Sequence, residues 1–201
     1  MRFCALALAA ALPCLAASAD WDKAKIQGST SAPVAIEVFG SFDCIHCKAL
    51  HEGMMRQIVQ DLVLSGKVCV VSREFPLFGP GHMYAREAAN LATAAARVGK
   101  YQAVSDALFK DQQVWEVNGK VWDTVAAALT PAEQIKVKAL SNDKDVLAEV
   151  QRDYDQGAAS GITQTPTLMV IRQRDGRRYP FQGLSISYEL FRDFITKDLE
   201  K

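Results

Sequence analysis

The sequence has no excess of charge of either sign, because 23 Lys and Arg residues balance 23 Asp and Glu residues. A chain without a basic balance has no bulk attraction for nucleic acid or for an anionic membrane surface, so we expect no nucleic-acid partner. No internal repeat or low-complexity stretch is present. The length of 201 residues suits one compact domain, with room for an insertion, and nothing in the sequence requires two domains.

The sequence also lacks an apolar run long enough to cross a membrane. Its apolar run at residues 3–12 is shorter than the roughly 20 residues that a spanning helix needs. This run follows Arg2 and precedes residues 17–19, Ala-Ser-Ala, a small-x-small triplet. Because this layout is typical of a secretory signal peptide, we expect residues 1–19 to be removed and the mature protein to be periplasmic or otherwise exported. A membrane anchor or a lipoprotein processed at Cys14 are the alternatives.

Cysteine is scarce, and two of the five cysteines fall within the predicted signal peptide. The mature chain would keep Cys44, Cys47 and Cys69, and this odd number excludes the disulfide framework of a small secreted scaffold. Cys69 alternates with valines in an apolar segment, where a free cysteine behaves as a small hydrophobic residue. One spaced pair, Cys44 and Cys47, remains to carry chemistry.

Hydrophobic periodicity predicts the order strand, helix, strand, a long block of helices, two strands and a last helix. The predicted strands cover residues 34–40, 67–75, 167–173 and 177–183, with a hairpin turn at 174–176. The predicted helices run from the cysteine pair to near residue 66, over 85–98, 101–110 and 121–129, from 131 onward, and over 144–159 and 188–199. Gly53 marks a possible kink in the first helix. Thr130 and Glu133 form a predicted capping box, and Ser187 is the expected cap of the last helix.

The motif Cys44-Ile45-His46-Cys47 lies where the first strand passes into the first helix. Free backbone N–H groups and the helix dipole stabilise negative charge at such a position, so the thiolate of Cys44 is favoured. A cationic His46 would favour it further. A lowered thiol pKa makes Cys44 a good leaving group and makes its disulfide with Cys47 oxidising. The spacing therefore predicts a redox-active pair.

A metal site is the alternative from another class, with Cys44 and Cys47 as ligands for zinc or Cu(I). Structural zinc sites usually need two pairs of ligands, and the sequence has no second CxxC, CxxH or HxxxH motif. A site made from the two cysteines, Cys69 and one histidine remains conceivable. His51 lies at helical spacing from Cys47, so one interpretation places it beside the site, but we expect it to be an exposed helix residue. We expect His82 to lie where a helix begins.

Thr165 and Pro166 directly precede the third strand. The combination of a CxxC motif on a strand-to-helix turn with a Thr-Pro pair that opens a late hairpin resembles the thioredoxin superfamily, in which this proline is cis and lies against the active-site cysteines. The long helical block makes the chain similar to the DsbA-like thiol-disulfide oxidoreductases, over about residues 33–200. This resemblance implies an α/β fold, namely a thioredoxin fold with an inserted helical domain. Its two halves would be residues 20–81 and 162–201, with the insertion at 82–161.

The resemblance also implies a role for each site residue. Cys44 would be the nucleophilic cysteine, Cys47 the resolving cysteine and His46 the residue that tunes Cys44. Thr165 and Pro166 would offer backbone to an extended substrate segment. No cofactor is implied. The expected partners are unfolded or reduced exported proteins and a membrane quinone-linked protein that re-oxidises the pair.

Two departures from the family pattern bear on this hypothesis. Thioredoxin-like proteins commonly bury a carboxylate in the strand before the CxxC motif, and Val38 occupies the matching position here. Glu37 is one residue earlier, so its side chain should point to the opposite face of the sheet, away from a proton relay to Cys47. Thr165 is the second departure, because isomerases of the superfamily often carry threonine before the proline whereas the enterobacterial oxidase pattern has valine.

The choice among oxidase, isomerase and reductase therefore stays open at this point. Similar isomerases usually carry an N-terminal dimerisation domain, and residues 20–32 are too few to form one. We accordingly expect a monomeric oxidase that donates the Cys44–Cys47 disulfide.

Overall fold

The computed structural model describes residues 22–183 and 186–199, so the predicted signal peptide lies outside the described residues. A five-stranded sheet of order β1-β3-β2-β4-β5 forms the centre. The strands are β1 (Ile26–Gln27), β2 (Val34–Gly40), β3 (Val68–Glu74), β4 (Thr167–Arg172) and β5 (Arg177–Gln182). β2 and β3 are parallel, and the other neighbouring pairs are antiparallel. The four strands predicted from the sequence are confirmed. β1 was missed because a two-residue edge strand carries no periodic signal.

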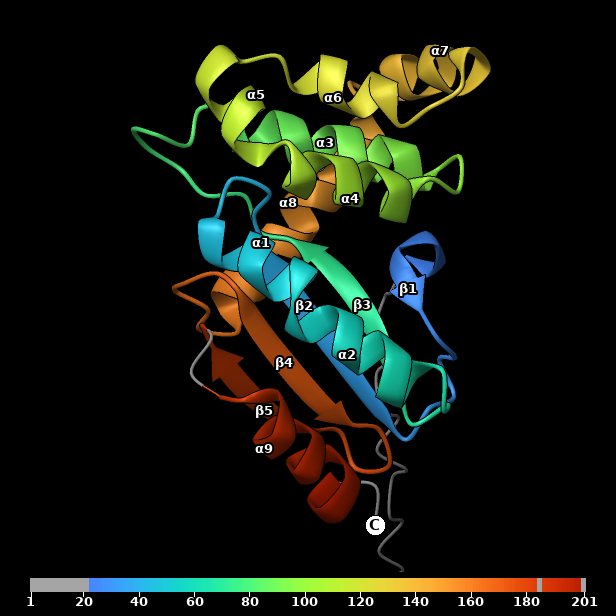
Figure 1. Cartoon of the computed structure of the whole chain (residues 1–201), viewed down its shortest axis with the longest axis vertical. Coiled ribbons are helices and arrows are strands. Elements are labelled where there is room, and N and C mark those ends of the chain that lie inside the picture. Colours follow the sequence, from blue (N-terminus) through green and yellow to red (C-terminus); the bar gives the residue numbers. More distant parts are fainter. Residues whose placement is uncertain (1–21, 184–185, 200–201) are drawn as a thin grey trace, which may run out of the picture.

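Helices cover both faces of this sheet (Figure 1). α1 (Ile45–Glu52), α2 (Met54–Ile58), the π-helical segment Val59–Val63 and α9 (Tyr188–Asp193), which continues as Phe194–Leu199, pack on one face. α8 (Lys144–Ala159) packs on the other. The alternation of β2 assigns its side chains to these two layers: Ile36 joins the α1 side, whereas Ala35 and Phe39 join the α8 side. Both faces are therefore buried, which explains the nearly continuous apolar sequence of β2.

Gly53 separates α1 from α2, as the predicted kink site suggested. Its backbone has φ −108° and ψ −99°, outside the helical region, although its N–H still donates to the carbonyl of Ala49 at 3.1 Å. The helix that follows the cysteines is thus made of two short helices, and the second is directed along the sheet. The predicted cap of α9 is also confirmed, since Ser187 Oγ accepts the N–H of Leu190 at 3.4 Å.

Five helices lie between β3 and α8 in the chain and form a layer at one end of the sheet (Figure 1). They are α3 (Ala85–Ala96), α4 (Tyr101–Lys110), α5 (Gln112–Asn118), α6 (Val121–Ala127) and α7 (Pro131–Leu140). Trp115 is fully buried in this layer and donates its indole N–H to the carbonyl of Leu108 at 2.8 Å. The capping box of Thr130 and Glu133 is confirmed. α5 was not predicted, because its seven residues are too few for a clear helical period. None of the helices formed by the described residues is both long and apolar enough to span a membrane.

Glycine allows α8 to approach the sheet closely. A Cβ atom on Gly157 would lie 2.7 Å from the ring of Phe75 and 3.0 Å from that of Phe39. Phe75 in turn stacks on Tyr154 of α8, with ring centroids 4.6 Å apart. α8 is therefore held against the sheet at the strand ends where the cysteine motif begins.

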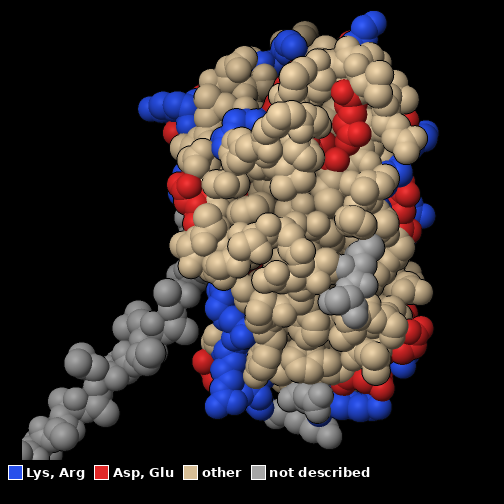
Figure 2. All heavy atoms as spheres, turned by 90° about the vertical axis from the view of Figure 1, so that its left-hand side faces the viewer, with Lys and Arg blue, Asp and Glu red and all other residues tan. Residues whose placement is uncertain are grey.

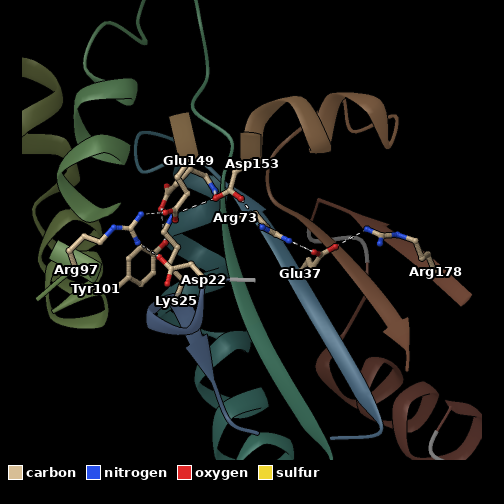
Figure 3. Close-up of polar contacts among 10 residues, drawn as sticks. Asp22, Lys25, Glu37, Arg73, Arg97, Tyr101, Glu149, Asp153 and Arg178 are labelled. Carbon is tan, nitrogen blue, oxygen red and sulfur yellow. Dashed lines mark hydrogen bonds and ion pairs between the residues drawn. The ribbon is translucent and has the colours of Figure 1, made fainter. Parts of the chain in front are cut away.

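A chain of ion pairs crosses the α8 face of the sheet (Figure 3). Arg178 of β5 contacts Glu37 of β2 at 2.7 Å, and Glu37 contacts Arg73 of β3 at 2.8 Å. Arg73 reaches Asp153 of α8, also at 2.8 Å. Because the side chain of Glu37 is completely buried, its charge depends chiefly on the buried Arg73, whose loss would leave a costly buried charge.

A second group of ion pairs ties the N-terminal segment to the helical layer. The ammonium of Lys25 is buried and lies 2.9 Å from Glu149, 3.4 Å from Asp153 and 3.5 Å from Glu74. Glu74 also accepts a hydrogen bond from the hydroxyl of Tyr101 at 2.8 Å. Burial raises the pKa of Glu74 to about 7, with Lys25 opposing that shift. This group joins segments that are far apart in the chain (Figure 3).

Candidate functional site

Cys44 is the N-cap residue of α1. Its backbone is extended, with φ −85° and ψ 118°, and its Sγ accepts the backbone N–H of Cys47 at 3.4 Å. The strand-to-helix turn predicted from the sequence therefore places the sulfur where free N–H groups of the first turn converge. Cys44 and Cys47 are both free thiols, with exposed fractions of 7% and 3%.

The two thiols have opposite pKa shifts. The pKa of Cys44 is lowered from 9.0 to about 5, chiefly by a hydrogen bond from the side chain of Cys47, against the effect of burial. The Thr165 side chain and the backbone N–H groups of Cys47 and His46 lower it further. The pKa of Cys47 is raised well above 9.0, first by burial and then by Cys44. At neutral pH the stable charge of the pair therefore resides on Cys44.

Thr165 and Pro166 lie beside the cysteines although they are far along the chain. The Thr165–Pro166 peptide bond is cis. The protonated thiol of Cys44 can donate to the carbonyl oxygen of Thr165 at 3.4 Å, and Pro166 shares a cavity wall with Cys47. The carbonyl contact favours the thiol form, whereas the other hydrogen bonds favour the thiolate and prevail.

The three histidines occupy different environments. The side chain of His46 is exposed on α1, and this residue contributes to the lowered pKa of Cys44 through its backbone N–H. The prediction of an exposed helix residue was wrong for His51. Its side chain is 23% exposed, its Nε2 lies 2.7 Å from Asp106, and its ring lies against that of Phe109 at an interplanar angle of 34°, with the ring centroids 4.6 Å apart. α4 packs over α1 here, and this tertiary contact could not be read from the periodicity of α1.

Sequence reasoning did not identify Asp43 and His82 as neighbours of the site. Asp43, directly before Cys44, is buried and accepts a hydrogen bond from Ser41, while its other oxygen lies 2.7 Å from His82 Nδ1. His82 precedes α3, as predicted. Glu116 of α5 lies close enough to Asp43 for the two charges to interact, and its pKa is raised by burial and then by Asp43. The sequence did hold one signal for this group, since Asp43 is an acidic residue directly before the CxxC motif.

The expected arrangement of Val38 and Glu37 is confirmed. Val38 lines the same cavity as Cys47, whereas Glu37 points to the α8 face and binds Arg73. The cavity measures about 420 Å³ and is bounded by α1, α2, α4 and the edge of the sheet. Glu74 and Tyr101 also contribute to its wall.

The described residues bring together no group of three or more His, Cys, Asp or Glu side chains that could hold a metal ion. Cys69, the third cysteine of a conceivable zinc site, is completely buried in β3. Its thiol pKa is raised to about 11 by burial, so the residue is a core thiol, as predicted.

A family model described as Thioredoxin matches residues 22–196, which is most of the chain. The chain belongs to the thioredoxin family. The solved structures that it resembles share its fold, a thioredoxin fold with a helical insertion. The fold class predicted from the cysteine motif, the Thr-Pro pair and the helical block is thus confirmed.

Two solved structures illustrate this likeness. The chain matches α-DsbA1 of Wolbachia pipientis with a TM-score of 0.70 and 20% identity, over 88% of this chain and 90% of that chain. It matches oxidised BdbD of Bacillus subtilis with a TM-score of 0.65 and 23% identity, over 88% of this chain and 93% of that chain. Such identities establish the fold alone.

One curated relative is named as an antiporter. The chain is 27% identical over 177 residues to a protein named Na(+)/H(+) antiporter NhaA 3 from Salinispora tropica. The match covers 83% of this chain but 24% of that protein, so the chain spans about a quarter of the length of this relative. The antiporter name gives no information about the chemistry of Cys44 and Cys47.

Proposed function

We propose that the protein is an exported thiol-disulfide oxidoreductase that donates the Cys44–Cys47 disulfide to folding proteins. The observation that carries this proposal is the opposite pKa shift of the two thiols. A thiolate stabilised on Cys44 stabilises the reduced form, which makes the disulfide a stronger oxidant. A purely structural disulfide has no need of such an asymmetry.

The proposed reaction has two exchanges. A substrate thiolate attacks Cys44 Sγ and forms a mixed disulfide, while the electron pair of the Cys44–Cys47 bond leaves with Cys47, which takes up a proton. A second substrate thiolate then attacks the substrate sulfur of the mixed disulfide. Cys44 leaves as its stable thiolate, and the substrate keeps the new disulfide. His46 is proposed to tune Cys44 in these steps.

The surface around Cys44 suits an unfolded polypeptide. Figure 2 shows the side of the molecule where α1 begins, and most of this side is free of Lys, Arg, Asp and Glu. Large exposed apolar side chains come from the start of α1, the 75–84 loop and α5, namely Ile45, Phe78, Met83, Val114 and Val117. Thr165 and Pro166 are proposed to offer backbone to an extended segment here.

A disulfide isomerase or reductase of the same fold is the nearest alternative. The pKa of about 5 for Cys44 favours the oxidant, because a reductase needs a less stabilised thiolate. The return to the disulfide is assigned to a membrane quinone-linked partner, and the protein is proposed to act as a monomer after removal of residues 1–19. A zinc or Cu(I) role is not proposed, because the described residues assemble no cluster of ligands around the pair.

The redox equilibrium of residues 20–201 with glutathione tests this function, with the state of Cys44 and Cys47 read by alkylation. We expect a potential of roughly −120 to −180 mV, and a value near about −270 mV would indicate a reductase. Oxidation of a reduced substrate and rearrangement of a scrambled one, compared side by side, separate an oxidase from an isomerase. Cys47→Ala should accumulate the mixed disulfide at Cys44, and Cys44→Ala should form none.

A further inference from the structure

The cavity behind Cys47 has a polar wall that the proposed exchange reaction leaves unexplained. α1 contributes Cys47 and His51 to this wall, and α4 contributes Gln102, Ser105 and Asp106. Among the described residues, Gln102 Nε2 and Ser105 Oγ are buried without a hydrogen-bond partner. Buried polar atoms are nearly always satisfied by protein or ordered water. A cavity of about 420 Å³ has room for several waters, so these atoms point to a hydrated cavity.

Cys47 needs such a connection, because its proton must move during the reaction. When a substrate thiolate attacks Cys44, Cys47 leaves with the bonding electrons inside a site where burial disfavours a thiolate. A leaving thiol of high pKa departs slowly unless a proton reaches it. The exposed fraction of Cys47 is 3%, so the proton must come through the protein or through the cavity.

His51 is the best-placed group to supply that proton. It lies one helical turn after Cys47, so the two side chains share a face of α1, with Cβ atoms about 6 Å apart. Its Nε2 lies 2.7 Å from Asp106, and the ring is held on Phe109. Imidazole exchanges protons readily near neutral pH, and a carboxylate partner orients it.

Glu74 is the competing group in the same cavity. Its carboxylate already accepts the Tyr101 hydroxyl at 2.8 Å and lies 3.5 Å from the ammonium of Lys25. These contacts join Glu74 to the ion pairs that hold the N-terminal segment. The His51–Asp106 pair has no such structural network, which favours it as the mobile proton donor.

We propose that His51, oriented by Asp106, delivers the proton to Cys47 through water in this cavity. The inference rests on the proposed function and assigns a proton route to it. The substrate thiolate forms the bond to Cys44, the electron pair of the broken disulfide passes to Cys47 Sγ, and the imidazolium of His51 gives up its proton by way of water. Re-oxidation returns that proton to His51. Asp106 acts as a positioning residue.

Other charged groups surround this pair and belong to the test. Arg56 of α2 and Arg73 and Glu74 of β3 line the cavity together with Tyr101 and Asp106 of α4. On α1 itself, Lys48 and Glu52 pair with each other at 2.6 Å, and Lys48 also donates to the carbonyl of Lys110. Glu52 interacts electrostatically with His51 but does not line the cavity, so Glu52→Gln tests whether a change of charge next to the imidazole reproduces the effect of losing it.

The test measures reduction of the Cys44–Cys47 disulfide by excess glutathione across the neutral pH range, with alkylation as the readout. Each rate constant is divided by the concentration of glutathione thiolate. We expect this quotient to fall with rising pH in the wild type, because general acid catalysis weakens as the protonated donor becomes scarcer. His51→Gln should lower it by about tenfold at the acidic end and leave it flat. Asp106→Asn should reduce the pH dependence, and Glu52→Gln should keep a pH-dependent profile because it leaves His51 and Asp106 in place.

Chemical rescue completes the test. The variant His51→Ala leaves space for a small molecule in a cavity that is open to solvent. Added imidazole should restore the rate of this variant and leave the wild type unchanged. A wild-type profile in His51→Gln, a flat profile in Glu74→Gln instead, or no rescue by imidazole would overturn the proton route. So would a uniform loss of rate at every pH together with an altered pKa of Cys44, which would indicate a structural role.

Failure of this inference is distinguishable from failure of the proposed function. If the wild-type pair forms a disulfide that glutathione reduces, but the His51 variants behave as the wild type, the proton route alone is wrong. If the wild-type pair forms no reducible disulfide, the exchange reaction itself is wrong and the proton route fails with it.

Discussion

The thiol of Cys44 lies 3.4 Å from the carbonyl oxygen of Thr165, although 121 positions separate the two residues in the chain. β2 and β4 are neighbours in the sheet, with Phe39 paired to Thr167, and this register carries the Thr-Pro segment to the start of α1. The same contact forms one wall of the environment of the thiol. The reactive sulfur and its neighbours are thus positioned by the sheet as well as by the helix.

The low pKa of Cys44 should depend on Cys47. The side chain of Cys47 provides the largest contribution to the lowering, so Cys47→Ala should raise the pKa of Cys44 from about 5. Cys47→Ser keeps a hydrogen-bond donor and should retain more of the lowering. The ultraviolet absorbance of the thiolate, titrated against pH, measures both. Equal values in the alanine and serine variants would contradict the hydrogen-bond explanation.

The same shift predicts how the stability of the reduced protein depends on pH. The folded pKa of Cys44, about 5, lies below the ordinary value of 9.0. Its stabilising contribution is therefore complete above about pH 9 and is lost as the pH falls through about 5. The oxidised protein lacks this thiol, so the unfolding free energy of the reduced form minus that of the oxidised form should increase from pH 5 to 9. A difference independent of pH would refute the assignment.

Thr165→Val should raise the pKa of Cys44, because the Thr165 side chain is the second group that lowers it. Valine has nearly the shape of threonine but no hydroxyl. Thr167→Val is the matched control, since the Thr167 hydroxyl donates to the carbonyl of Gln164 at 2.8 Å. That variant should cost about 1 kcal/mol of stability without moving the thiol pKa. Thiolate absorbance and urea unfolding measure the two effects.

Glu74→Gln should stabilise the protein at alkaline pH relative to acidic pH. The folded pKa of Glu74, about 7, is raised above the ordinary 4.5, mainly by burial. The stabilising contribution of the protonated Glu74 carboxyl to folding is fully present below pH 4.5 and is lost as the pH rises through about 7. Glutamine resembles the protonated form, so the variant's unfolding free energy relative to wild type should improve between about pH 5 and about pH 8, by on the order of 2 kcal/mol. Urea unfolding of the oxidised protein at both pH values measures this, and no improvement would contradict the raised pKa.

Arg73→Met should destabilise the protein by about 3–5 kcal/mol, because it removes the buried cation that Glu37 and Asp153 share and leaves each buried carboxylate with one partner fewer. Arg178→Met is the matched control. Arg178 also binds Glu37, but its side chain is 38% exposed, so its loss should cost about 1 kcal/mol or less. Denaturant unfolding compares the two variants. A similar loss of unfolding free energy in both variants would show that burial does not determine how much these ion pairs contribute to stability.

Local sequence was sufficient for the strands, most of the helices and the placement of the cysteine motif. Short runs of apolar and β-branched residues specify β2 and β3, the Thr130 capping box specifies α7, and the CxxC spacing at a strand-to-helix turn specifies which thiol is favoured. These features depend on residues that are near one another in the chain, so their physical causes are visible in the sequence.

Tertiary structure decided the rest. The contact of His51 with Asp106, the pairing of Asp43 with His82 and the cavity that joins Cys47 to Glu74 all arise where separate elements pack together. The period of a strand or helix shows which face is buried, but it does not show what covers that face. The sequence therefore determined the thiol pair and the fold around it, while packing of α4 over α1 decided which groups surround the buried sulfur.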